Sequence, residues 1–387
     1  MKLSPLHLAA LAVVAVPELN AAGTRPPYLT TEDFIVGGVL DSEGRHWIVK
    51  YPRTDQGGTF LEAETAVAGA LIGELREGRL SFDVMHPEGY ATYEGRRAVV
   101  YPAPLGKPLP LDRLDLVHAR EVGRTVAAIH SIQPQVLTRA GLPTYTAHAV
   151  RERLASELDD ATTAAHVPAL LCRRWLNMFD DDALWNFETT VVHGDMADEN
   201  LLWSEATIRT VLGFGEAHVG DPAADLAPLS AALSDAAFDA LFSAYSQALA
   251  HNADEHLLER TTLMSEFALV RWLLHGVLAG DSHVIDDATT MLEQLAIEID
   301  ANPETSPGPS WHLDTPLPVE TPLPAAGSTE PFSQELAQSD AHDPADTHST
   351  ISPLQLSHGA AAPQVPTALT ADLAADDTTD DAPTTAK

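Results

Sequence analysis

The sequence predicts an α+β protein with two lobes, a small β-rich N-terminal lobe and a larger helical C-terminal lobe, followed by a disordered acidic tail. Three observations predict this organisation. Short β-like runs precede a proline- and glycine-rich cluster at 101–108, helical periodicity follows it, and hydrophobic periodicity ends near residue 300. The expected boundaries are 1–101, 102–300 and 301–387.

The first lobe is expected to begin with an amphipathic helix that covers the strands. Ser4-Pro5 is typical of a helix N-cap with proline at the first helical position, and an apolar run follows from Leu6 to Val16. A short signal peptide is the alternative, because Met1-Lys2 precedes this run. His7 and the Pro17-Glu18 step favour the helix, and the run is too short to span a bilayer.

Three strands and one helix are expected in the rest of the first lobe. Residues 34–40 and 46–51 are rich in β-branched and aromatic side chains, and they flank a turn at 41–45. Residues 97–101 form another β-like run. A helix is expected between them, from Phe60 to Leu75.

Helices are expected to dominate the second lobe. Apolar residues recur at steps of three and four, which places them on one helical face. Two such series stand out, Leu116, Ala119, Val122, Val126 and Ile129, and then Met264, Phe267, Val270 and Leu274. Between them, residues 200–203 and 208–214 predict a β-hairpin.

Composition excludes several classes of function. The net charge of −34 and the sequence pI near 4.6 argue against binding to nucleic acid or to an anionic membrane. Cys172 is the single cysteine, so an internal disulfide is excluded, and no Cys/His spacing indicates zinc. We expect Cys172 to lie on a helix and the protein to be cytoplasmic.

The tail differs in composition from the rest of the chain. It holds 13 of the 28 prolines, and it has 13 acidic residues against one basic residue, Lys387. Such a segment buries too little apolar surface to offset the entropy of ordering, so disorder is predicted. The sequence identifies no partner for it.

The segment His193-Gly194-Asp195-x4-Asn200 has the residue types of a phosphoryl-transfer loop. Transfer to a hydroxyl needs a carboxylate beside the acceptor and metal ligands beside the phosphates. Asp195 would accept the hydroxyl proton, and the Asn200 carbonyl would bind Mg²⁺. The alternative for Asp195 is a carboxylate that caps a turn.

This segment resembles the catalytic loop of the aminoglycoside/macrolide phosphotransferase family, which has a protein-kinase-like fold. The family pattern continues with Gly-Asp-Pro-x-x-Asp-Leu-Ala, and residues 220–227 match it residue by residue. Ile129-His130-Ser131 and Arg271–Gly276 also resemble family segments. The resemblance covers about residues 1–300, and it is nearest to the macrolide-phosphotransferase-like branch.

The resemblance implies a set of site residues and cofactors. His193 and Asp195 take the catalytic positions, and the acceptor is the hydroxyl of a small molecule. ATP or GTP and Mg²⁺ are the implied cofactors. The nucleotide residues are Lys50, its partner Glu64 with Glu62 as the alternative, and the hinge residues Tyr101 and Ala103.

One position departs from the family pattern. Gly213 stands where the family has the aspartate that binds Mg²⁺ between the phosphates. Glu216, Asp198 or Glu199 could substitute for that aspartate, and Glu216 with Asn200 is the expected metal pair. Two functions follow, an active small-molecule kinase and a pseudokinase that binds a nucleotide or another ligand. His218 is expected to be a packing histidine.

Overall fold

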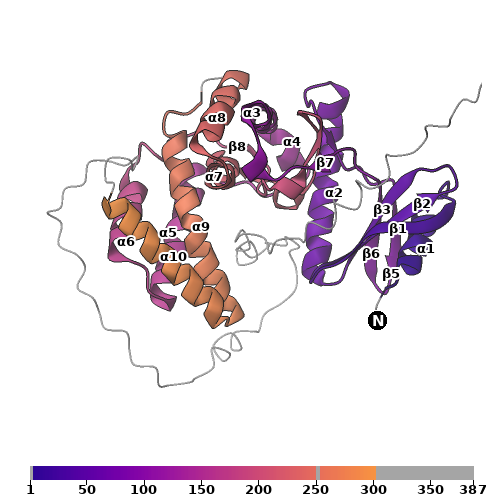
Figure 1. The fold of residues 1–387 in the computed structure, drawn as a ribbon, viewed down its shortest axis with the longest axis horizontal. Coiled ribbons are helices and arrows are strands. Elements are labelled where there is room, and N and C mark those ends of the chain that lie inside the picture. The colour runs from indigo at the N-terminus through magenta and orange to yellow at the C-terminus, as the bar shows by residue number, and fades with distance from the viewer. Residues whose placement is uncertain (1–2, 250–252, 302–387) are drawn as a thin grey trace, which may run out of the picture. The chain divides into compact units, whose positions relative to one another are not determined.

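The computed structural model describes residues 3–249 and 253–301, so the predicted tail lies almost wholly outside the described residues. The predicted α+β class is confirmed (Figure 1). The first sheet is antiparallel, with the strand order β1-β2-β3-β6-β5. Its strands are β1 (Ala21–Thr30), β2 (Phe34–Asp41), β3 (His46–Pro52), β5 (Gly89–Tyr93) and β6 (Arg96–Pro102).

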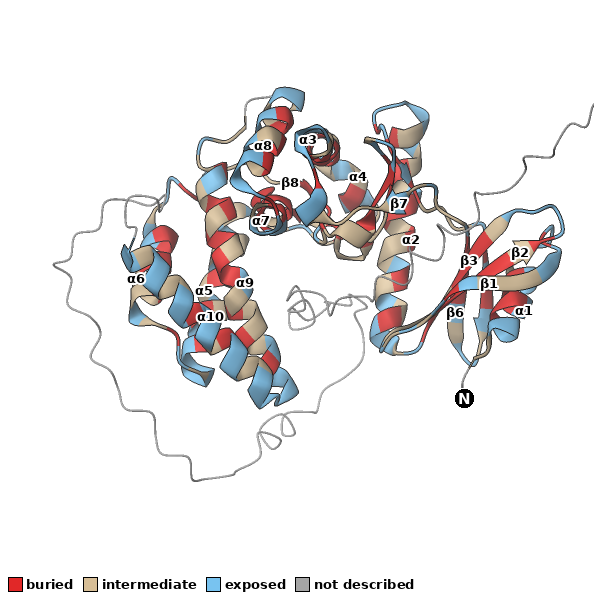
Figure 2. Ribbon diagram, in the orientation of Figure 1, coloured by how far each residue is buried: buried red, intermediate tan, exposed pale blue. Residues whose placement is uncertain are grey.

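Helix α1 (Pro5–Ala15) packs on this sheet, as the helical interpretation of the N-terminus predicts. Leu8, Leu11 and Ala12 are buried in one core with strand residues. Figure 2 shows both buried and exposed positions along α1. Gly37 permits the close approach, because a Cβ atom there would lie 2.5 Å from Leu8 Cδ1. The helix is less amphipathic than expected, since Val14 is 72% exposed on the outer face.

The β2–β3 hairpin is confirmed, and its turn is held by one buried carboxylate. Asp41 Oδ1 accepts hydrogen bonds from the backbone N–H groups of Glu43 and Arg45, at 2.9 and 2.8 Å. Asp41 Oδ2 accepts from the indole N–H of Trp47 at 3.0 Å. This hairpin fixes the position of Lys50 near the end of β3.

The predictions missed two strands of this sheet and the start of its helix. Pro26 and Pro27 argue against a strand, but β1 is an edge strand, and its register shifts between Arg25 and Tyr28 to accommodate the prolines. Helix α2 (Asp55–Arg76) begins five residues before the predicted Phe60. The Thr54 hydroxyl caps it by accepting the Gly57 N–H at 2.9 Å.

The second part of the chain is mainly helical. Of the first predicted series, Ala119, Val122, Val126 and Ile129 are buried in α3, whereas Leu116 is 44% exposed. The second series lies on α9, which runs beside α10 (Figure 1). The helices are α3 (Leu116–His130), α4 (Pro134–Arg139), α5 (Ala147–Ala164), α6 (Ala169–Asp180), α7 (Ala223–Ala232), α8 (Asp235–Ala248), α9 (Leu257–Ala279) and α10 (Ser282–Ala301).

Two small sheets carry the loops of interest. The predicted hairpin is present as β9 and β10, and it pairs with β4 on one side and β7 on the other. Strand β8 pairs with β11 antiparallel, which opposes Val192 to His218. The strands are β4 (Asp83–Val84), β7 (Lys107–Pro108), β8 (Thr190–Val192), β9 (Leu201–Ser204), β10 (Thr207–Val211) and β11 (His218–Gly220).

Short 3-10 turns complete the described elements. They are η1 (Leu111–Arg113), η2 (Asp198–Asn200) and η3 (Phe214–Glu216). Because β7 pairs with β9, the proline-rich linker already belongs to the second part at Lys107. The boundary at 101–102 stays a prediction.

Within the described residues, α9 is the one helix long and apolar enough to cross a membrane by length and composition. It contacts α5, α7 and α10, and its Phe267 and Val270 are fully buried. A core helix of a folded domain passes the same test, so α9 is weak evidence for a membrane span. Cys172 lies on a helix, α6, as predicted, and it is half-buried.

Candidate active site

The loop from His193 to Asn200 leaves β8, and a buried carboxylate on α7 fixes its start. Asp225 Oδ2 accepts the His193 N–H and Oδ1 accepts the Gly194 N–H, both at 2.8 Å. Asp225 is fully buried. Asp225 therefore braces the start of this loop.

A chain of buried side chains fixes Asp225 in turn. The imidazole of His130 on α3 lies with Nε2 3.1 Å from Asp225 Oδ2 and Nδ1 2.9 Å from the Tyr245 hydroxyl. Burial favours the protonated form of Asp225, but the hydrogen bonds and charges of His130, His193 and Gly194 hold its pKa below the ordinary value. Asp225 is thus an ionised anchor that joins α3, α7 and α8 to the loop.

His193 positions the loop instead of facing a substrate. Its Nδ1 accepts the Asp195 N–H at 3.2 Å, so Nε2 carries the proton and donates to the Leu212 carbonyl at 2.6 Å. Its ring is fully buried and lies edge-on to Phe214, with centroids 4.4 Å apart. Because backbone groups occupy both ring nitrogens, we assign His193 a positioning role.

The Asn200 side chain holds Asp195. Asn200 Nδ2 donates to Asp195 Oδ2 and to the Asp195 backbone carbonyl, both at 2.9 Å. Gly194 has φ +86°, and a Cβ atom there would lie 2.6 Å from the Glu216 carbonyl oxygen. Only glycine fits both conditions, so this position brings η3 against the loop beside Asp195.

Of the side chains at 200 and 213, the Asn200 amide oxygen is the one group that a metal could bind, and the role of Asn200 as a metal ligand stays a prediction. Gly213 offers no side chain, and the Asn200 amide nitrogen is committed to Asp195. A Cβ atom at Gly213 would lie 2.5 Å from Cγ, Nδ2 and Oδ1 of Asn200. Among residues 3–249 and 253–301, no three His, Cys, Asp or Glu side chains meet at metal-binding distance. The role of Glu216 as a metal ligand stays a prediction.

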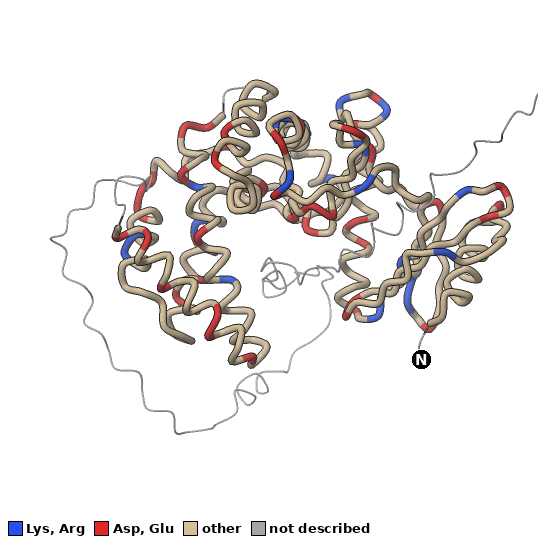
Figure 3. Tube along the Cα trace, in the orientation of Figure 1, with Lys and Arg blue, Asp and Glu red and all other residues tan. Residues whose placement is uncertain are grey.

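Two carboxyl groups near Asp195 have strongly perturbed acidity. Burial, and then the charge of Asp195, raise the pKa of Glu216 to about 7, and Arg153 opposes this in part. Burial, and then a hydrogen bond with Asp198, raise the pKa of Glu199 to about 7. Figure 3 shows how Asp and Glu recur along the described trace. A cation beside this loop would favour the charged form of both groups.

Tyr145 and Arg153, which sequence reasoning missed, lie on the Glu216 side of the loop. The Tyr145 N–H donates to the Val219 carbonyl at 2.8 Å, and its ring lies edge-on to His218 at 5.4 Å. The Arg153 guanidinium lies 5.9 Å from the centre of the Tyr145 ring. Within the described residues, the buried Tyr145 hydroxyl has no hydrogen-bond partner. No local pattern marks these residues, because strand pairing and α5 bring them here. His218 packs as predicted.

Lys50 and Glu64 form the predicted ion pair. Lys50 Nζ lies 2.7 Å from Glu64 Oε2 and 4.5 Å from the centre of the Phe34 ring. The Lys50 side chain is 26% exposed, whereas Glu64 is 13% exposed. Glu62, the alternative partner, is exposed on α2. The contact of this pair with phosphate stays a prediction.

The linker has fewer free backbone N–H donors for adenine than the predicted hinge would need. Tyr101 is fully buried, in a small core with Leu61 and Val99. The Ala103 N–H already donates to the His46 carbonyl at 2.9 Å, so this donor is not open to a base. Pro102 and Pro104 have no N–H. Any backbone donor to a base must therefore come from residues after Pro104.

The matching segment at 220–227 has structural roles. Asp221 Oδ1 accepts the N–H of Ala223, the first residue of α7, at 3.0 Å. Asp221 Oδ2 also pairs with Arg260 Nε of α9 at 2.8 Å, and Arg260 donates to the Leu184 carbonyl at 3.0 Å. Both charged groups are buried, so this pair ties the loop before α7 to α9 and to the 181–189 segment.

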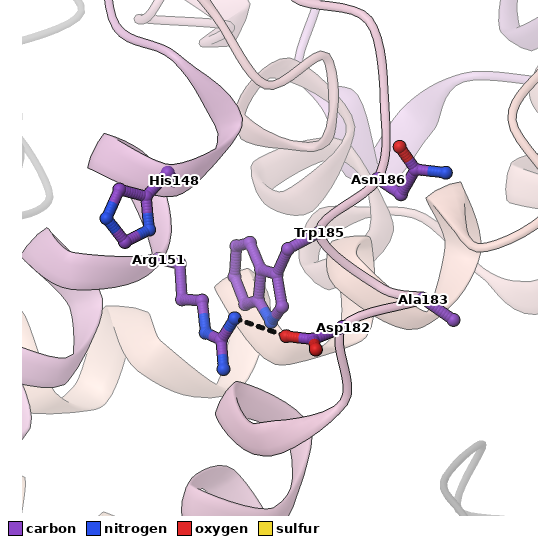
Figure 4. A pocket seen from close by; sticks show the side chains of 6 residues that line it. All are labelled: His148, Arg151, Asp182, Ala183, Trp185 and Asn186. Atoms are coloured by element: carbon purple, nitrogen blue, oxygen red, sulfur yellow. Dashed lines mark hydrogen bonds and ion pairs between the residues drawn. The ribbon is translucent and has the colours of Figure 1, made fainter.

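A pocket of about 500 Å³ opens between α5 and the segment that follows α6 (Figure 4). Arg151 Nη1 pairs with Asp182 Oδ1 there at 2.8 Å. The six lining residues come from outside the 193–200 loop, and they are His148, Arg151, Asp182, Ala183, Trp185 and Asn186.

Residues 39–260, more than half of the chain, match the model of the phosphotransferase enzyme family. The chain is 25% identical over 271 residues to the viomycin phosphotransferase of Streptomyces vinaceus, covering 65% of this chain and 91% of that protein. It is 23% identical over 211 residues to the uncharacterized protein YcbJ of Bacillus subtilis, covering 51% of this chain and 66% of YcbJ, just under two thirds of its length.

Solved structures share the fold. The apoenzyme of macrolide 2'-phosphotransferase MphH from Brachybacterium faecium superposes with a TM-score of 0.62 at 22% identity, covering 73% of this chain and 97% of that one. A GDP complex of an aminoglycoside 2'-phosphotransferase-IIIa mutant superposes with a TM-score of 0.63 at 16% identity, covering 78% and 100%. The two-lobed fold of these phosphotransferases, predicted from the sequence, is therefore confirmed for this chain.

Proposed function

We propose that this chain, which belongs to the phosphotransferase enzyme family, transfers the terminal phosphoryl group of ATP or GTP to a hydroxyl of a small molecule. The observation that carries the proposal is the held carboxylate of Asp195. It lies on a loop fixed by Asp225, and the Asn200 amide orients it. Such positioning is most of what a protein contributes to phosphoryl transfer.

In the proposed step, the acceptor oxygen forms a bond to the γ-phosphorus. The bond from that phosphorus to the bridging oxygen breaks, and the nucleoside diphosphate leaves with the bonding electron pair. The Asp195 carboxylate takes the proton of the acceptor hydroxyl. The products are a phosphate ester and a nucleoside diphosphate, so atoms and charge balance.

Lys50 is the proposed contact for the phosphates. Its ammonium is held by Glu64 and packs over Phe34, so one orientation is favoured before the nucleotide arrives. The likeness to a GDP complex supports nucleotide binding. This likeness does not distinguish ATP from GTP, and the phosphate-transfer assay with each nucleotide does.

We place the acceptor on the Glu216 side of Asp195. The Asn200 amide already binds Asp195 Oδ2, and the charges of Asp195 and Arg153 both act on Glu216. Carboxyl groups with raised pKa values favour an acceptor with a cationic group, because its charge would stabilise their ionised forms. Macrolides, aminoglycosides and viomycin are the acceptors to test, since relatives and structures of this fold are named for them.

A pseudokinase is the second candidate, and Gly213 is the observation that favours it. The named relatives and structures are phosphotransferases, apart from the uncharacterized YcbJ, and they favour transfer. The proposed location is the cytoplasm, where both nucleotides are abundant. Fractionation of cells that produce the protein tests this location.

The deciding experiment is transfer of labelled terminal phosphate from ATP and from GTP to the acceptor panel. We expect label in at least one acceptor, and loss of that label in Asp195→Asn. Asp160→Asn is the matched control, because Asp160 is exposed on α5. Nucleotide-dependent stabilisation without any transfer across the panel would support the pseudokinase instead.

A further inference from the structure

We propose that Arg153 sets the charge preference for the acceptor, so that the site takes a small molecule with one cationic group in preference to a molecule with several. Arg153 is then a specificity-determining residue, and Glu157 is the residue that positions it. The inference rests on the proposed function for the place of the acceptor, on the Glu216 side of Asp195. Its test measures binding and needs no transfer.

One carboxylate on α5 fixes Arg153 and joins it to α9. Glu157 Oε1 accepts from Arg153 Nε at 3.0 Å, and Glu157 Oε2 accepts from Arg271 Nε at 2.9 Å. The Glu157 side chain is only 13% exposed, so both hydrogen bonds lie largely out of water. Two guanidinium charges against one carboxylate charge leave these three side chains with a net charge of +1. The chain as a whole carries −34, so this cluster is a local exception.

A series of contacts connects this cluster to the loop that carries Asp195. The Arg153 guanidinium lies 5.9 Å from the centre of the Tyr145 ring, and that ring lies edge-on to His218 at 5.4 Å. His218 Nδ1 donates to the Glu216 carbonyl at 2.8 Å. Each step joins neighbouring groups, so the positive charge of Arg153 belongs to the same side of the loop as Glu216.

The charge of Arg153 acts on the carboxyl group beside which we place the acceptor. Burial and Asp195 raise the pKa of Glu216, and Arg153 partly opposes this rise. Burial lowers the pKa of His218, and the charges of Arg153 and Arg271 lower it further, so His218 is neutral. One ligand ammonium is therefore attracted by the carboxylates, whereas each further ammonium on the same ligand is repelled by a fixed positive charge.

Replacement of Arg153 separates its charge from its structural role. Its side chain is 37% exposed, and Glu157 keeps Arg271 as a partner when Arg153 is replaced, so no carboxylate is left buried alone. Arg153→Gln removes the charge, and Arg153→Lys keeps it without the planar guanidinium. Arg124→Gln is the matched control, because Arg124 is an exposed arginine on α3 that pairs with Glu121 of the same helix.

The test measures two affinities by calorimetric titration in dilute buffer without nucleotide. The ligands are erythromycin, which has a single amino group, and kanamycin, which has several. We expect Arg153→Gln to bind kanamycin more tightly than the wild type by about fivefold or more, and to bind erythromycin within about twofold of the wild type. Arg153→Lys and Arg124→Gln should match the wild type for both ligands.

The outcomes that overturn the proposal concern the pattern across ligands and variants. Equal changes for both ligands in Arg153→Gln, or no gain for kanamycin, would show that Arg153 does not set a charge preference. A gain for kanamycin in Arg153→Lys as large as in Arg153→Gln would show that the shape of the side chain matters instead of its charge. The expected binding pattern without any phosphate transfer would support this inference and count against the proposed function alone.

Discussion

Glu216→Gln offers a test of the electrostatics around Asp195 that needs no substrate. The pKa of Glu216 rises from the ordinary value of 4.5 to about 7, first because the carboxyl is buried and second because Asp195 is close. At about 1.4 kcal/mol for each pKa unit, charging this group costs the folded protein roughly 3 kcal/mol, as an order of magnitude. Glutamine has nearly the same shape and carries no charge.

The sign of the effect follows from proton linkage. Between pH 4.5 and about 7 the folded protein holds a proton that the unfolded chain has released, so stability falls as pH rises through this window. Below the window both states are protonated and the cost is absent. Above it the cost is fully present, and Glu216→Gln removes it.

Thermal unfolding at pH 5 and at pH 8 measures the difference. We expect Glu216→Gln to unfold a few degrees above the wild type at pH 8 and within about 1 °C of it at pH 5. Glu62→Gln, at an exposed position on α2, is the control and should match the wild type at both values. A gain of the same size at both pH values, or a loss at pH 8, would refute the reasoning.

Three further predictions concern Lys50, Leu8 and Asp225. Lys50→Met should weaken nucleotide binding at least tenfold by calorimetric titration, and Glu64→Gln should weaken it less because the ammonium remains; equal affinity in Lys50→Met and wild type would contradict the phosphate role. Leu8→Ala should cost about 2–5 kcal/mol in denaturant unfolding because its side chain is buried under the sheet, whereas Val14→Ala should change little; equal costs would show that α1 does not pack as described. Asp225→Ala leaves two backbone N–H groups and His130 buried without their acceptor, so a loss of about 3–5 kcal/mol, or failure to fold, is expected in circular dichroism melts; a melt like that of the wild type would remove Asp225 as the anchor.

Much of the fold was predictable because local sequence patterns indicate its strands, turns and helices. Alternation and turn residues marked the hairpin that ends near Lys50, and apolar spacing marked α3. The resemblance to a family then located the loop around Asp195 and the partner of Lys50. The strand β1 was not predictable, because the cost of two prolines in a strand depends on whether that strand lies at an edge.

The finer details of the site depend on contacts that are distant in sequence. The Ala103 N–H cannot bind a nucleotide base because it already donates to the His46 carbonyl, where β3 and β6 lie side by side. No local sequence pattern predicts this contact. Tyr145 and Arg153 interact electrostatically with Glu216, and the bridge from Thr144 to Val219 and the position of α5 bring them to this part of the chain. The sequence identified Gly213 as a departure, but the filling of its space by Asn200 needed coordinates.

Transfer of labelled terminal phosphate, compared between the wild type and Asp195→Asn, tests the central claim most directly. The account predicts a phosphorylated acceptor with the wild type, and a rate at least a hundredfold lower in the variant at an unchanged Tm. A variant that transfers phosphate as fast as the wild type would show that Asp195 is not the base, and the proposed mechanism would be wrong.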